Sequence, residues 1–221
     1  MCDWIRECEN AVCNVIQIIK QIPELADTRL AVVGDLALWR YLPDNRVATS
    51  IDVVTNSLAV GFLKRKLVNH PNSPFTQKKE VLWYCSPTGR DIPINMSSQW
   101  GSHTLPRPEH LVHSLPYGEV PYVSLEDLAL FKILSSYSKA TNRVQRRQDA
   151  EDAAALLDYK LARQSPAQRQ VWVDEKLRAF ERGVMEAAAE PIFQHASPVG
   201  QAPYDKRRVV VSAVEVSALE T

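Results

Sequence analysis

The sequence is poor in the features that mark several large classes of protein. Only seven of its 221 residues are glycine, and none forms the G-x-G-x-x-G or G-x-x-x-x-G-K pattern of dinucleotide and P-loop sites. No apolar run approaches the roughly 18 residues that span a bilayer. The first residues lack the basic flank and apolar stretch of a signal peptide. We therefore expect neither a dinucleotide-binding fold nor contact with a membrane.

An excess of charge and paired cysteines are also absent. Lysine plus arginine (26) balances aspartate plus glutamate (26), so no overall field attracts nucleic acid. The basic stretches 143–147 and 206–208 are short and contain no aromatic residues, which gives no strong nucleic-acid signal. The four cysteines lack the C-x-x-C spacing of zinc sites. Reduced thiols in a cytoplasmic protein are the expectation.

What is present is an ordinary globular composition, with 45% apolar and 24% charged residues. Apolar residues recur at helical spacing near the N-terminus, and short β-branched runs follow as predicted strands. A P-T-G turn between two apolar runs predicts a hairpin. The expected elements are a helix over 4–22, a strand over 29–33, a helix over 35–41, a strand over 51–55, a helix capped by Asn56 or Ser57 and reaching Leu67, and hairpin strands over 80–86 and 90–96.

After Pro121 the composition changes to that of helices. Ser124 followed by Asp127 is typical of a helix start, and two further helices are predicted over 149–157 and 165–180. The sequence thus predicts an α+β protein with a mixed β-sheet flanked by helices. We expect a core over 1–120, a helical segment over 121–189 that packs on it, and a tail over 190–221 that is an edge strand or partly disordered.

The segments around the first two predicted strands carry a resemblance to a known family. Residues 33–38 read VGDLAL and residues 46–54 read RVATSIDVV. This order, a strand, a glycine turn, a helix, a strand with Asp52 and a hairpin strand with Asp91, resembles the minimal nucleotidyltransferases of the AbiEii-toxin-like and related fungal groups. A lysine on a later helix (Lys132) and the segment 147–152 (RQDAED) are similar to the family's helical motifs. The resemblance covers about residues 30–157.

The resemblance implies transfer of a nucleotidyl group from an NTP with the help of Mg²⁺ or Mn²⁺. Two such ions clamp the attacking and leaving oxygens and are held by carboxylates on neighbouring strands. It implies that Asp52 and Asp91 are the catalytic metal ligands, with Asn95 as the other candidate for the third position. The expected nucleotide-binding residues are Gly34, Asp35, Ser50 and Lys132, of which Gly34 would admit the triphosphate and Lys132 would steady a phosphate.

Three residues depart from the family pattern. Ser50 stands where the family has its first metal-binding aspartate, and a neutral hydroxyl cannot replace a bridging carboxylate. Asn95 replaces an aspartate if the third position is there, whereas Asp91 keeps it if the position lies four residues earlier. Asp35 follows Gly34 where the family has a small residue, and its charge would repel a bound phosphate.

These departures leave several functions open. The favoured hypothesis is a weak or inactive NTP-binding nucleotidyltransferase homologue with an eroded metal site. The alternative is an active transferase that moves NMP onto a hydroxyl of a protein, an RNA or a small molecule. A more distant alternative is a protein-interaction module that binds a protein partner through the proline-rich loop and the tail. All nucleotidyltransferase hypotheses require residues 50, 52 and 91 or 95 to converge beside Gly34.

Overall fold

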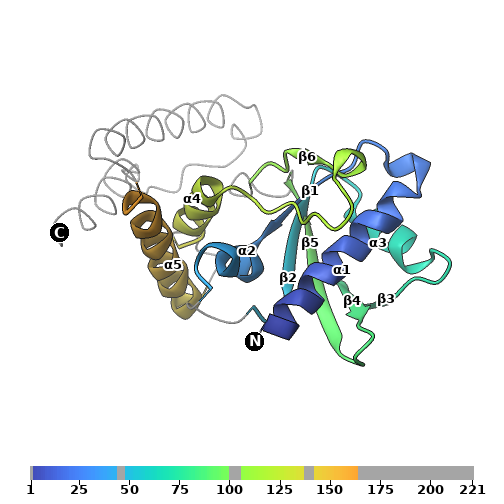
Figure 1. The fold of residues 1–221 in the computed structure, drawn as a ribbon, viewed down its shortest axis with the longest axis horizontal. Coiled ribbons are helices and arrows are strands. Elements are labelled where there is room, and N and C mark those ends of the chain that lie inside the picture. Colours follow the sequence, from blue (N-terminus) through green and yellow to red (C-terminus); the bar gives the residue numbers. More distant parts are fainter. Residues whose placement is uncertain (1, 44–47, 100–105, 137–141, 164–221) are drawn as a thin grey trace, which may run out of the picture. The chain divides into compact units, whose positions relative to one another are not determined.

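The computed structural model describes residues 2–43, 48–99, 106–136 and 142–163 (Figure 1). The chain divides into two compact units, residues 1–156 and residues 157–221. The first unit contains every strand of the described residues and all but the end of the last described helix. The predicted helix over 165–180 and the predicted tail lie outside the described residues.

A mixed six-stranded sheet forms the centre of the first unit. Strands β2 and β5 run parallel to each other, and the other neighbouring pairs are antiparallel. This sheet with its flanking helices confirms the α+β class. The strands, in spatial order, are β3 (Phe75–Lys78), β4 (Val81–Cys85), β5 (Asp91–Ser98), β2 (Ile51–Thr55), β1 (Arg29–Val33) and β6 (His110–Leu111).

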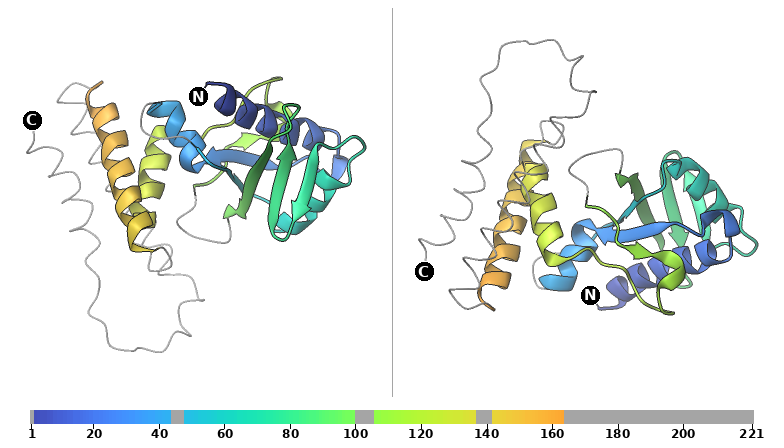
Figure 2. Two further views of the ribbon diagram at one scale, coloured as in Figure 1. Left: turned by 90° about the horizontal axis from the view of Figure 1, so that it is seen from below. Right: turned by 90° about the horizontal axis from the view of Figure 1, so that it is seen from above.

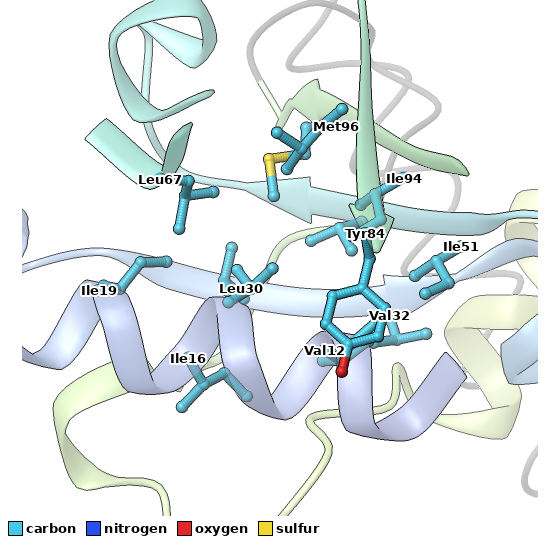
Figure 3. Packing of buried hydrophobic residues seen from close by; sticks show 14 of the residues in the cluster. Val12, Ile16, Ile19, Leu30, Val32, Ile51, Leu67, Tyr84, Ile94 and Met96 are labelled. Atoms are coloured by element: carbon cyan, nitrogen blue, oxygen red, sulfur yellow. The ribbon is translucent and has the colours of Figure 1, made fainter. Parts of the chain in front are cut away.

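Helices α1 (Cys2–Lys20) and α3 (Val60–Val68) cover one face of the sheet. The apolar side chains of α1 recur every three or four residues, which places them on one side of the helix. Figure 3 shows Val12, Ile16 and Ile19 of this helix facing the apolar side chains of the strands. Burying each such side chain contributes about 1.5–3 kcal/mol, so this layer is the main hydrophobic core.

The other α-helices of the described residues are α2 (Gly34–Tyr41), α4 (Leu125–Ser136) and α5 (Arg143–Leu161) (Figure 2). The predicted start of α4 is confirmed, because the Ser124 hydroxyl accepts the Asp127 backbone N–H at 3.1 Å and donates to its carboxylate at 2.6 Å. Helix α5 begins at Arg143, six residues before the predicted start. The Asn142 side chain caps it by accepting the backbone N–H of Gln145 at 2.9 Å.

Two further elements differ from the predictions made from sequence. Helix α3 begins at Val60 and not beside Asn56 or Ser57, because the Asn56 amide bonds elsewhere, to the Arg29 N–H and the Asp27 carbonyl. Strand β3 was not predicted, since Phe75 is its single buried side chain and three polar residues follow. The short β6 and a 3₁₀ turn hold His110 and His113, in a stretch that was predicted as loop.

None of the helices in the described ranges is both long and apolar enough to cross a membrane.

Candidate functional site

A pocket of about 240 Å³ opens between the sheet and the helices α4 and α5. Strands β1, β2 and β5 supply its floor, and the two helices supply polar side chains and one aromatic ring. All of its lining residues belong to the unit 1–156. They are Val33, Gly34, Asp52, Val53, Val54, Asn95, Ser97, Phe131, Ser135, Gln145 and Asp149.

Gly34 and Asp52 meet at the floor of this pocket. Val33 pairs with Asp52 across the antiparallel strands β1 and β2, so the next residue, Gly34, lies beside the Asp52 carboxyl group. A Cβ atom at Gly34 would overlap Asp52 Oδ2, and the backbone there has a φ of +68°. Both the close approach and the left-handed backbone require glycine at this position.

Asn95 is the direct neighbour of Asp52 on the parallel strand β5. Its amide Nδ2 donates a hydrogen bond of 2.9 Å to Asp52 Oδ1. Burial raises the pKa of Asp52 and the nearby charge of Asp35 adds to this rise, whereas the Asn95 hydrogen bond and the charge of Lys132 oppose it. A half-buried carboxyl group with a raised pKa in a pocket is typical of functional sites.

Lys132 lies behind the pocket and does not line it. Its ammonium group is 2.9 Å from both Asp149 Oδ1 and Asp152 Oδ2, and 3.7 Å from Asp35 Oδ1. Burial alone would lower the pKa of Lys132, but the hydrogen bonds and charges of Asp152 and Asp149 outweigh it and raise that pKa. The lysine side chain is 4% exposed, so this is a buried ionic cluster that joins α2, α4 and α5.

The Asp149 carboxylate has partners on both oxygens. Oδ1 accepts from Lys132 and from Gln145 Nε2 (3.1 Å), and Oδ2 accepts from Ser135 Oγ (2.7 Å). Asp149 therefore borders the pocket with its charge compensated. Arg147, in the same sequence motif, points to solvent and pairs with Glu151.

The structure does not bring Asp91 to this pocket. Asp91 begins β5 opposite Cys85 and forms an exposed ion pair with Lys78 at 2.9 Å, which lowers the pKa of Asp91. It lies on the same face of β5 as Asn95, but four residues of strand separate the two by about 13 Å. Of the two candidates for the third position, Asn95 is therefore the one that lies beside Asp52.

The other predicted site residues have varied positions. Ser50 lies in the bend before β2 and is not among the pocket-lining residues. Asp35 stands in the first turn of α2 and points toward Lys132. Arg46, the first residue of the segment 46–54 quoted for the resemblance, lies outside the described residues.

Four lining residues lie outside both the predicted site residues and the quoted motif segments: Ser97, Phe131, Ser135 and Gln145. Phe131 belongs to the apolar run of α4, and an aromatic residue in such a run is expected to be a core residue and not a site residue. Ser97 lies two residues after Asn95 and therefore on the same face of β5. This spacing is the signal from which Ser97 could have been predicted as a neighbour of the site. Nothing in the sequence marks Ser135 or Gln145.

The donor set does not fit two divalent cations. Within the described residues, no group of three or more His, Cys, Asp or Glu side chains is arranged to hold a metal ion. The pocket offers two carboxylates, Asp52 and Asp149, and Asp149 is already paired with Lys132. A pair of Mg²⁺ ions needs bridging carboxylates that these residues do not supply.

Comparisons with known proteins give no family for this chain. No protein-family model matches it, and a search of curated proteins found no relative.

Proposed function

We propose that this chain is a nucleotidyltransferase-fold protein that does not transfer nucleotides and uses the pocket to bind a nucleotide-derived ligand. What supports the proposal is that Gly34, Asp52 and Asn95, three positions of the family pattern, meet in one pocket. Of these three residues only Asp52 has a carboxylate, whereas nucleotidyl transfer with two metal ions needs several carboxylates.

The reaction itself explains why one carboxylate is too few. In-line transfer places negative charge on the attacking and the leaving oxygen, and two metal ions about 3.5–4 Å apart stabilise both. Here the partner opposite Asp52 is an amide, and the nearest further acid in the pocket, Asp149, is paired with Lys132. The lysine expected to steady a phosphate is held by two carboxylates in the same cluster.

The direct test is incubation of the full-length protein with labelled NTPs and Mg²⁺ or Mn²⁺. The proposal predicts no transfer of label and no release of pyrophosphate, together with binding of a nucleotide or nucleoside. A ligand at one hundred times its Kd should stabilise the protein by about 2.7 kcal/mol in thermal unfolding. Label transfer would contradict the proposal, and so would the absence of any nucleotide or nucleoside binding.

A second experiment restores the missing charge. Asn95→Asp places a carboxylate beside Asp52, and we expect Mg²⁺ to stabilise this variant and not the unchanged protein. Ser50→Asp tests the other family position in the same way. Asp91→Glu is the matched control, since Asp91 lies at the far end of β5, and it should leave the response to Mg²⁺ unchanged.

The second candidate function is an active transferase that uses one metal ion. The observation that favours it is the raised pKa of Asp52 beside the close approach of Gly34, a combination found in catalytic pockets. Mg²⁺ is often held by one or two carboxylates together with substrate phosphates. Under this hypothesis Asp52→Asn abolishes label transfer, whereas Asp91→Asn leaves it intact.

A further inference from the structure

The charges around the pocket indicate which part of a nucleotide it can accept. Among its lining residues two ionise, Asp52 and Asp149, and both are acids. Asp149 is compensated by Lys132, but the Asp52 carboxylate has a neutral partner, the Asn95 amide. A ligand therefore meets a carboxylate at the floor of the pocket and, among the described lining residues, no lysine or arginine.

The nearest buried cation is not placed to offset that charge for a phosphate. Lys132 lies outside the pocket lining, and its ammonium group is within 2.9 Å of both Asp149 and Asp152, with Asp35 at 3.7 Å. Lys132 is thus already bound by the two aspartates of α5 and not available to a phosphate. A phosphate in the pocket would approach the Asp52 carboxylate with no lysine or arginine beside it among the described lining residues.

The size and chemistry of the lining point the same way. A volume of about 240 Å³ is below the range of about 300–1,000 Å³ that is usual for pockets of drug-sized ligands. Phe131 offers an aromatic surface, while Asn95, Ser97 and Gln145 offer neutral hydrogen-bonding groups. Asp52 Oδ1 accepts from Asn95, whereas Oδ2 lies against Gly34 and has no side-chain donor among the described residues.

Building on the proposed function, we propose that the pocket binds a phosphate-free nitrogen heterocycle of the nucleoside class. An amino or ring N–H group of the base donates to the Asp52 carboxylate, and the ring packs on Phe131. Phosphates weaken this binding, because a carboxylate and a phosphate charge about 5 Å apart repel by more than the energy that changes Kd tenfold.

The test compares the four nucleosides adenosine, guanosine, cytidine and uridine with their mono- and triphosphates. Binding to the full-length protein is measured by calorimetry at low salt and mildly alkaline pH, with and without Mg²⁺. We expect at least one nucleoside to bind and its triphosphate to have a Kd at least about tenfold higher. A high salt concentration should narrow this difference, because salt screens the repulsion.

Variants identify the group responsible. Asp52→Asn should raise the Kd of the nucleoside by about tenfold, the effect of losing a charge-assisted hydrogen bond, and should reduce the discrimination against phosphates. Asp91→Asn removes a carboxylate from the same face of β5 without touching the pocket, and should change neither value. Thermal unfolding of each variant confirms that it is folded.

The outcomes separate this inference from the proposed function. Tighter binding of the nucleoside supports both. Equal or tighter binding of the triphosphate overturns the inference and leaves the proposed function standing. Failure of every nucleoside and nucleotide to bind overturns both.

Discussion

The two faces of the sheet are built on different principles. On the face under α1 and α3, apolar side chains from the strands and helices pack together in one buried cluster. On the other face lie Asp52, Asn95 and the pocket, with the buried cluster around Lys132 behind it. Neighbouring residues on one strand belong to the two sides, since Ile94 is fully buried and Asn95 is exposed.

This difference separates what holds the fold from what gives the pocket its chemistry. Burial of apolar surface stabilises a fold without any need for charged groups. A half-buried carboxyl group lowers stability unless it is paired, so Asp52 is best explained by the pocket and not by the fold. Lys132 has an intermediate role, because its two aspartate partners make it a structural element behind the pocket.

The largest effect should come from breaking the ionic cluster. Lys132→Met leaves Asp149 and Asp152 buried without their cation, which should lower the free energy of unfolding by about 3–5 kcal/mol. Urea denaturation measures this loss. The matched control is Lys66→Met, whose ion pair with Glu24 is largely exposed and should contribute about 0–1 kcal/mol. Equal losses in the two variants would show that the cluster has no special structural role.

The contrast between the two faces can be tested at adjacent residues of β5. Ile94→Ala should cost about 2–5 kcal/mol of stability through the cavity it leaves, with no change in nucleoside affinity measured on the folded protein. Asn95→Ala should cost about 1 kcal/mol and weaken nucleoside binding, because it removes the partner of Asp52. Chemical denaturation and calorimetry give both values. If Ile94→Ala weakened nucleoside binding and Asn95→Ala caused the larger loss of stability, the division between the two faces would be wrong.

The close approach at the pocket floor should make Gly34 sensitive to substitution. Gly34→Ala should cost about 2–4 kcal/mol, because the left-handed backbone is unfavourable for alanine and the new methyl group overlaps Asp52. Gly118→Ala is the matched control, since its φ is +79° and no atom lies within 4 Å of the added Cβ. This variant should lose only the free energy needed to hold alanine in the left-handed backbone conformation, about 1–2 kcal/mol. Combining Gly34→Ala with Asp52→Ala should bring the loss close to that of the control.

The smallest effect is a gain in stability from removing the charge of Asp52. Because its folded-state pKa is raised, the folded protein keeps the proton to a higher pH than the unfolded chain, and stability falls as pH rises through that window. Asp52→Asn should therefore stabilise the protein at pH 7, by about 1 kcal/mol, and should give no gain well below the ordinary pKa of aspartate. Denaturation across the acidic pH range measures this.

Asp91→Asn provides the control with the opposite sign. Lys78 lowers the pKa of Asp91, so the stability that this carboxylate contributes is present above its ordinary pKa and is lost as pH falls. The variant should show no gain at pH 7. A gain of equal size in both variants would mean that the effect of Asp52 has nothing to do with its burial.

Much of the fold could be predicted from local patterns. Strands β1 and β2 have the predicted bounds, since each is a short apolar or β-branched run between turn-forming residues. Strand β3 was missed because it is held by pairing with β4 and not by a pattern of its own. The start of α3 was misplaced because Asn56 bonds to residues 27 and 29, which are distant in sequence.

The site was predictable only in part, for a related reason. The residues Gly34, Asp52, Asn95 and Lys132 could be chosen from motifs, but whether Asp91 or Asn95 stands beside Asp52 depends on the register between β2 and β5. A shift of four residues along a strand leaves the face unchanged and moves a side chain by about 13 Å. Sequence alone could not distinguish the two.

By itself, then, the sequence determined the class of fold, the apolar side of each element and the scarcity of carboxylates near residue 52, because these follow from composition and from periods of two and 3.6 residues. Only the tertiary structure decided that Asn95 binds Asp52, that Lys132 is held by Asp149 and Asp152, and that Phe131 and Gln145 border the pocket. Those contacts join residues far apart in the chain, and strand register and helix packing determine them.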